Sequence, residues 1–267
     1  MLGFNLAIAE QSVVSKPLAS QNNLPSTKYE RIISLDLCVD WLLTYYADSS
    51  QVQALSPLQQ RFPLPVNNHT WPVHDGSLEQ IVSLHPDLVL VGEFNALMLR
   101  SRLQRLGYQV EVLPLPRSLK EVQAYLDSFL SLIDVPDALS GKGRSWLVLE
   151  EPVAGPRLLL LGANGVGTGQ QTFEDQILTQ AGWQNYVTAI GYVRMDLEQL
   201  AMDPPDAILW SAPESAALAN QFAQHPVLSL QIPESAWLTT DYWRWQCPGP
   251  WTYELIEQLT SLREGLE

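Results

Sequence analysis

The chain contains 267 residues, enough for one large domain or for two lobes that each bury a core of their own. Hydrophobic residues make up 46% of the sequence, which is typical of a folded globular protein and argues against disorder. The formal net charge of −14 disfavours nucleic acids and anionic lipid surfaces as partners. No segment of the sequence is long and apolar enough to span a bilayer.

The start of the chain resembles the end of a signal peptide. Leu2 to Ala9 is apolar, and Ala7-Ile8-Ala9 has the small-x-small pattern of a cleavage site. The first basic residue is Lys16, so the basic region that opens a complete signal peptide is not present in front of this run. We interpret residues 1–28 as a residual signal peptide followed by a polar leader. The alternative is the frayed N-terminus of a cytosolic protein.

A strand is predicted at the start of each half of the chain. Arg31 to Leu35 is followed by a helical pattern, and Arg157 to Leu161 leads through a glycine-rich turn into another helical pattern. The predicted fold class is therefore α/β, with two similar lobes, each a mainly parallel sheet with flanking helices. The N-terminal lobe is expected over residues 29–116 and the C-terminal lobe over residues 151–267.

An internal repeat supports this division. The segment Ser77–Val91 reads almost the same as Asp196–Trp210. The residues that recur are Leu78, Glu79, Gln80, Pro86, Asp87 and Leu90 in the first copy, and Leu197, Glu198, Gln199, Pro205, Asp206 and Leu209 in the second. In each copy, apolar residues at helical spacing precede a proline that stops the helix, and a short apolar run follows. Such a run is typical of a strand in a parallel sheet that is covered on both faces.

A helical connection is predicted between the two lobes. Ser118 and Glu121 form a capping box, and apolar residues follow at helical spacing as far as Ile133. A second helical stretch is expected from Asp137 toward Leu149. We therefore predict that residues 117–150 form a long backbone helix that joins the lobes.

Two motifs contain residues that could bind phosphate or a metal ion. Gly162 to Gly169 follows a strand and precedes a helix, which is the position of a phosphate-binding loop. It lacks the Lys-Ser/Thr of a P-loop and the G-x-G-x-x-G spacing, so a turn is the favoured interpretation. His69 and His74 flank Trp71 and could ligate a metal ion, but no matching group stands out in the second lobe.

The chain has only two cysteines, Cys38 and Cys247, and neither belongs to a C-x-x-C zinc pattern. Cys38 follows a predicted strand, as catalytic nucleophiles often do, yet the sequence has no G-x-S-x-G elbow. Aromatic residues gather in Tyr242-Trp243-Arg244-Trp245, close to Trp251. If this segment is extended, its side chains alternate between two faces, and one face could stack on a flat or bulky ligand.

With these features, the sequence resembles the class III periplasmic substrate-binding proteins, the helical-backbone metal-receptor superfamily. The resemblance extends from Arg31 to Leu262. It rests on Arg31–Leu35, Leu78-Glu79 through Leu90, Leu103-x-x-Leu106-Gly107, Leu197-Glu198 through Asp206, and Pro248-Gly249-Pro250. Some members pair an N-L-C-T-D start with a C-G-G-P end, and here Asp36–Asp40 and Cys247–Pro250 match them with Asp36, Val39 and Pro248 as departures.

The resemblance implies the periplasmic component of an ABC importer. Such a protein captures a metal chelate between its lobes, here a ferric siderophore, a corrinoid or haem, and delivers it to a permease dimer in the inner membrane. It implies a monomer with no catalytic residue, no cofactor and no nucleic-acid partner. The residues expected to line the ligand cleft are Trp71, His74, Arg194, Tyr242 and Trp245, with Arg244 as a further cation for an anionic siderophore. A direct metal-ion receptor and an enzyme using Cys38 are the alternatives.

The resemblance also implies roles for two matched pairs of residues. Glu79 and Glu198 occupy equivalent positions in the repeat, and in the related proteins a surface glutamate on each lobe docks onto arginines of the permease. Cys38 and Cys247 begin segments that approach the cleft in that fold, so the two cysteines either form a disulfide across the lobes or remain two free buried thiols.

Overall fold

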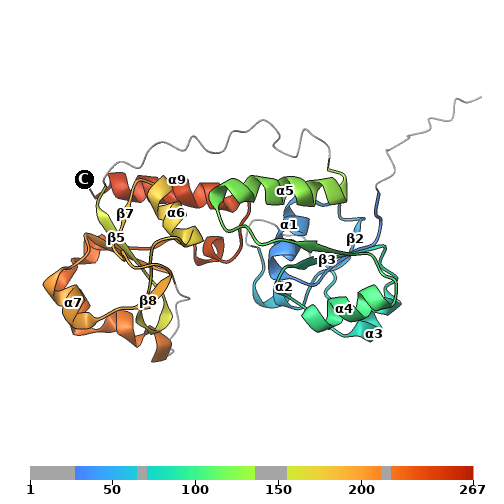
Figure 1. Ribbon diagram of the computed structural model, residues 1–267, viewed down its shortest axis with the longest axis horizontal. Helices are drawn as coiled ribbons and strands as arrows, with labels where there is room; N and C mark the ends of the chain where they lie inside the picture. The colour runs from blue at the N-terminus through green and yellow to red at the C-terminus, as the bar shows by residue number, and fades with distance from the viewer. Residues whose placement is uncertain (1–27, 65–70, 136–154, 212–217, 267) are drawn as a thin grey trace, which may run out of the picture.

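The computed structural model describes residues 28–64, 71–135, 155–211 and 218–266. These residues form two lobes side by side, an N-lobe that runs from β1 to α5 and a C-lobe that runs from β5 to α9 (Figure 1). The predicted α/β fold with two lobes is confirmed. The residual signal peptide and the second helical stretch expected after Asp137 lie outside the described residues.

The N-lobe contains a parallel sheet with the strand order β2-β1-β3-β4. The strands are β1 (Ile32–Ser34), β2 (Val52–Ala54), β3 (Leu88–Gly92) and β4 (Val110–Leu113). The four residues Leu88 to Val91 are fully buried. This explains why β3 reads as a continuous apolar run, since a strand covered on both faces has no polar side.

Helices cover both faces of this sheet. The core on one face joins β1 and β3 to α1 (Leu37–Tyr46) and α5 (Leu119–Ile133), and the core on the other face joins them to α3 (Leu78–Ser83) and α4 (Leu97–Arg105). A short helix, α2 (Leu58–Arg61), follows β2. Alternate residues of β3 supply the two cores, because successive side chains of a strand point to opposite faces.

The C-lobe contains a mixed sheet with the order β10-β9-β5-β6-β8, and β7 also pairs with β5. Its central strands β5 (Arg157–Leu161) and β9 (Ala207–Trp210) are parallel, as the repeat predicted. The remaining strands are β6 (Val166–Thr168), β7 (Gln184–Asn185), β8 (Tyr192–Arg194) and β10 (Trp237–Leu238). Strand β6 runs antiparallel to both β5 and β8, so the glycine-rich segment forms a turn and an edge hairpin.

The helices of the C-lobe are α6 (Phe173–Gln180), α7 (Leu197–Met202), α8 (Pro226–Gln231) and α9 (Trp251–Glu264). The described part of the C-lobe also contains the 3-10 segments η1 (Ala163–Gly165), η2 (Leu218–Gln224), η3 (Glu234–Ala236) and η4 (Tyr242–Trp245). The segment 242–245 is thus helical, so the extended conformation considered for its aromatic residues is wrong.

The aspartate of the repeat, Asp87 or Asp206, has the same structural role in both lobes. The Asp87 carboxylate accepts hydrogen bonds from the backbone N–H groups of Glu30 and Arg31, both at 2.9 Å. The equivalent Asp206 accepts one from the N–H of Arg157 at 2.6 Å. Each aspartate therefore fastens the turn after the helix to the start of the first strand, which satisfies backbone donors that the sheet leaves unpaired.

Two helices exchange contacts across the boundary between the lobes. In α5, Leu119 packs into the C-lobe core, whereas the other buried residues of the helix pack into the N-lobe core. In α9, Trp251 and Tyr253 belong to the N-lobe core, whereas Leu255 and Leu259 belong to the C-lobe core. The described part of the predicted backbone helix therefore covers the N-lobe and reaches the C-lobe only at its start, and α9 makes the reverse connection.

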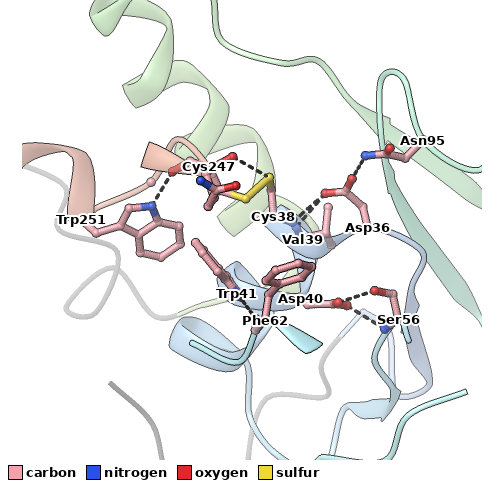
Figure 2. Close-up of a disulfide and its surroundings, with 12 residues drawn as sticks. Asp36, Cys38, Val39, Asp40, Trp41, Ser56, Phe62, Asn95, Cys247 and Trp251 are labelled. Atoms are coloured by element: carbon pink, nitrogen blue, oxygen red, sulfur yellow. Dashed lines mark hydrogen bonds between the residues drawn. A yellow bond between two sulfur atoms is a disulfide. The ribbon is translucent and has the colours of Figure 1, made fainter. Parts of the chain in front are cut away.

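A disulfide joins the lobes at this boundary. Cys38 in the first turn of α1 is bonded to Cys247, which precedes α9, with their Cα atoms 5.2 Å apart (Figure 2). Next to it, the Trp41 ring meets the Trp251 and Trp243 rings edge-on, with centroids 5.6 Å and 5.8 Å away. We call the disulfide, these three tryptophans and the exchanged ends of α5 and α9 the lobe junction.

The segment Asp36–Asp40 supports the lobe junction. The Asp36 carboxylate caps α1 by accepting hydrogen bonds from the N–H groups of Cys38 and Val39 at 2.8 Å and 3.1 Å (Figure 2). The Asp40 carboxylate accepts hydrogen bonds from the N–H and the hydroxyl of Ser56 at 2.9 Å and 2.5 Å. Burial raises the pKa of Asp36, and it raises the pKa of Asp40 to about 7.

Candidate ligand-binding site

A cavity of about 480 Å³ lies at the end of the N-lobe sheet. Its walls come from the residue after β1, from the loops before α2 and α3, and from the first turn of α4; the residues are Leu35, Pro57, His74, Gly76, Ala96, Leu97, Met98 and Leu99. We call it the N-lobe cavity. Carboxyl ends of parallel strands are the usual location of ligand sites in α/β sheets, so its position fits a binding site.

The first turn of α4 makes this cavity apolar. Leu97 is 54% exposed and Met98 is 72% exposed, and both follow β3 after a short loop. Exposed apolar side chains grouped at a cavity are uncommon in a protein without a ligand or partner. Sequence reasoning missed both residues, although an apolar segment directly after a buried strand was a signal that could have identified them.

His74 lies in the wall of the N-lobe cavity, but its ring nitrogens are engaged within the lobe. Nε2 is 2.8 Å from the carbonyl oxygen of Ser34, and Nδ1 accepts a hydrogen bond from the N–H of Gly76 at 2.9 Å. Burial lowers its pKa, which favours the neutral ring that these two contacts require. His74 can therefore offer a ligand the edge of its ring, while its nitrogens hold the loop before α3 against β1.

A second cavity, of about 180 Å³, is lined by both lobes. Leu115 and Pro116 come from the chain that leads into α5, and the C-lobe contributes Phe173, Glu174, Ile177, Tyr192, Arg244, Trp245, Gln246, Cys247 and Pro248. We call it the interlobe cavity. It includes one residue of the disulfide, so it adjoins the lobe junction.

Tyr192, Glu174 and Arg244, three polar residues of the interlobe cavity, are paired within the protein. The hydroxyl of Tyr192 lies 3.1 Å from both carboxylate oxygens of Glu174. Burial, with the Glu174 charge as a further cause, raises the pKa of Tyr192 to about 12. The Arg244 guanidinium contacts the carboxylate of Asp241 at 3.0 Å and also that of Glu254. The positive charge proposed for an anionic ligand is therefore already neutralised by two carboxylates.

The structure separates the residues that the sequence placed in one cleft. Trp245 lines the interlobe cavity, with its indole N–H donating to the Thr240 hydroxyl at 2.8 Å. His74 lines the N-lobe cavity. Trp71 packs against the N-lobe core, and Tyr242 lies half-buried in η4; neither lines either cavity. Arg194 is exposed on β8, on the same side of the strand as Tyr192.

Glu79 and Glu198 are both exposed, in the first turns of α3 and α7. The two helices lie on different lobes, and both lie away from α5 and α9 (Figure 1). Within the described ranges, no helix could cross a membrane and no three His, Cys, Asp or Glu side chains are grouped to hold a metal ion. His69, the other histidine considered for a metal, lies outside those ranges.

Known proteins resemble this chain in structure but not detectably in sequence. No protein-family model matches the chain, and no curated protein matches it in sequence. Solved structures do match. The periplasmic haem-binding protein RhuT from Roseiflexus sp. RS-1 superposes with a TM-score of 0.68 at 17% identity, over 89% of this chain and 99% of that one. The chain has the fold of periplasmic substrate-binding proteins.

Two further neighbours share this binding-protein fold. A possible iron-binding, periplasmic solute-binding protein from Staphylococcus epidermidis matches with a TM-score of 0.67 and 18% identity, over 88% of this chain and 98% of its own. The periplasmic vitamin B12-binding protein BtuF of Vibrio cholerae matches with a TM-score of 0.59 and 19% identity, over 89% and 97%. The neighbours thus cover different ligands on one fold, so the fold alone does not name the ligand.

Proposed function

We propose that the chain is the substrate-binding component of a bacterial ABC importer, located in the periplasm, and that it captures a metal chelate between its lobes. The observation that supports this most is the pair of cavities at the sheet end and the lobe boundary of a fold shared with periplasmic binding proteins. The protein acts as a monomer that delivers its ligand to a permease dimer in the inner membrane, without catalysis and without a resident cofactor.

The two rival functions receive less support. An enzyme that uses Cys38 as a nucleophile requires a free thiolate, whereas Cys38 is in a disulfide. A direct metal-ion receptor that uses His74 requires a free ring nitrogen, whereas both nitrogens have partners inside the N-lobe.

The proposal is tested with the purified protein and a panel of cobalamin, haem and ferric siderophores. Native mass spectrometry after desalting should detect one chelate bound per chain. A panel without any bound member, together with turnover in hydrolase or redox assays, would favour an enzyme. Retention of a bare metal ion after purification would favour the metal-ion receptor.

We propose that Glu79 and Glu198 dock the protein onto the permease. Both carboxylates are exposed at equivalent positions of the repeat, one on each lobe. Paired surface charges of this kind orient a docking protein and speed its encounter with a partner. The Glu79→Ala, Glu198→Ala double variant should keep the ligand affinity and lose most uptake in cells. Glu257→Ala on α9 is the matched control, and normal uptake by the double variant at physiological salt would contradict the assignment.

A further inference from the structure

The described residues that line the N-lobe cavity carry no formal charge. None of them is an Asp, Glu, Lys or Arg, and the one titratable side chain among them, His74, is held neutral by contacts at both ring nitrogens. The first turn of α4 instead presents Leu97 and Met98 to the solvent. A ligand in this cavity therefore meets aliphatic and thioether surface and finds no counter-ion there.

Among the described residues, the interlobe cavity offers no unpaired positive charge. Arg244 is paired with Asp241 and Glu254, and Glu174, which binds the Tyr192 hydroxyl, adds a carboxylate. Arg194 is exposed on the same face of β8 as Tyr192, but it is not among the residues that line the cavity.

An anionic chelate requires unpaired cationic side chains, and the described residues that line the two cavities provide none. Polyanions that enter a protein site give up hydration, and they are bound where several Arg or Lys side chains replace that hydration with charge-assisted hydrogen bonds. An uncharged chelate with an apolar outer surface has no such requirement, because burying apolar surface against Leu97 and Met98 is itself favourable.

We propose that the ligand is an uncharged or cationic metal chelate with an apolar face, and that Leu97 and Met98 form the subsite that binds this face. The class includes corrinoids and neutral ferric hydroxamates; it leaves out trianionic ferric catecholates and haem with ionised propionates. The proposal rests on the proposed function, because it selects among the chelates which that function allows.

The test uses pairs of ligands that differ in charge. One pair is a neutral ferric tris-hydroxamate and a trianionic ferric tris-catecholate, another is haem dimethyl ester and haem, and cobalamin is measured alongside. Dissociation constants come from quenching of tryptophan fluorescence at physiological salt. At least one uncharged chelate should bind about a hundredfold more tightly than the anionic member of its class, equivalent to about 2.7 kcal/mol. Equal or tighter binding of an anionic member overturns the proposal and leaves the proposed function standing, whereas a panel without any binding overturns both.

A charge placed on the wall provides the second readout. Met98→Arg should raise the affinity for the ferric tris-catecholate by about tenfold, and this gain should shrink with added salt. Met202→Arg is the matched control, because Met202 is 81% exposed on α7 and lines neither cavity. Both positions are exposed, so neither variant disturbs a core. Equal effects of the two substitutions, or no effect of Met98→Arg, would show that α4 does not contact the ligand.

Discussion

At the lobe junction, Trp41 and Trp251 are each 1% exposed and a disulfide ties the segments that carry them, whereas at the N-lobe cavity large apolar side chains remain open to the solvent. The difference separates two tasks. The lobe junction connects the core of the N-lobe to the core of the C-lobe, and its residues pack against one another. The wall of the N-lobe cavity leaves the apolar side chains of Leu97 and Met98 exposed. Two of the segments that resemble the family, Asp36–Asp40 and Cys247–Pro250, carry the cysteines of the junction, so this part of the resemblance describes how the lobes are joined.

The largest effect on stability is expected from removing the disulfide at the lobe junction. The Cys38–Cys247 disulfide has a sequence separation of 209, and closing a loop of this length stabilises a protein by about 5 kcal/mol in the chain-entropy model, which is an upper estimate. The Cys38→Ser, Cys247→Ser double variant should therefore unfold at a much lower guanidinium concentration than the oxidised wild type. Wild-type protein unfolded with reductant present is the control and should match the variant. Two reactive thiols in denatured protein without reductant would show that the bridge does not form.

A smaller effect at the junction depends on pH. Burial raises the pKa of Asp40 from 3.8 to about 7, so between these values the folded protein holds a proton that the unfolded chain has released. The stability from this proton is fully present below pH 3.8 and is lost as the pH rises through 7. Asp40→Asn should remove this loss, which amounts to up to about 4 kcal/mol at 1.36 kcal/mol per pKa unit.

The measurement is the free energy of unfolding of wild type and Asp40→Asn at several pH values between 4 and 8. Asp36, whose pKa is also raised by burial, leaves a residual slope in the variant. Asp48→Asn is the control, because the pKa of Asp48 is lowered by hydrogen bonds from Ser50 and its titration falls below this window. Parallel stability curves for wild type and Asp40→Asn would mean that Asp40 stays charged.

At the cavities, two tryptophans distinguish lining from packing. Trp245 lines the interlobe cavity, whereas Trp71 packs on the N-lobe core and lines neither cavity. Trp245→Ala should weaken binding of the chelate identified in the panel by about tenfold, since it removes aromatic contact area. Trp71→Ala should leave the affinity unchanged, measured at a temperature where both variants are folded. An equal loss in both variants would indicate that the substitution disturbs the lobes and not the contact.

The smallest effect is the motion of the lobes on ligand binding. The disulfide and the exchanged ends of α5 and α9 restrict the lobes to a small rotation, so scattering profiles with and without ligand should give nearly the same radius of gyration. The double cysteine variant should show a larger decrease on binding. A large decrease in the wild type would mean that the junction acts as an open hinge.

Much of the fold followed from local pattern. The strands around Leu88–Val91 and Ala207–Trp210 and the helices before them were predicted because a helical period, a proline stop and an apolar run each have a local physical cause. The helical turn at 242–245 was missed; in the structure its Arg244 pairs with Asp241 and with Glu254, which is distant in the sequence. The spacing of apolar residues within a short segment does not reveal contacts with residues that are distant in the sequence.

The candidate site was predicted less well, for a related reason. An aromatic residue indicates either a ligand contact or a core contact, and only three-dimensional packing decides between them, as Trp245 and Trp71 illustrate. Leu97 and Met98 were overlooked because apolar residues on a helix are read as core until their exposure is known. Exposure at the end of a sheet is a property of the assembled lobe.

The exchange of helix ends also sets the order in which the chain can mature. Trp251 and Tyr253 belong to the N-lobe core, although they follow all the strands of the C-lobe sheet in the chain. The N-lobe therefore cannot complete its core while it is being synthesised, and it waits for the C-terminal helix to arrive. The first half stays without a finished core until the second half has been made, and only then can Cys38 meet Cys247.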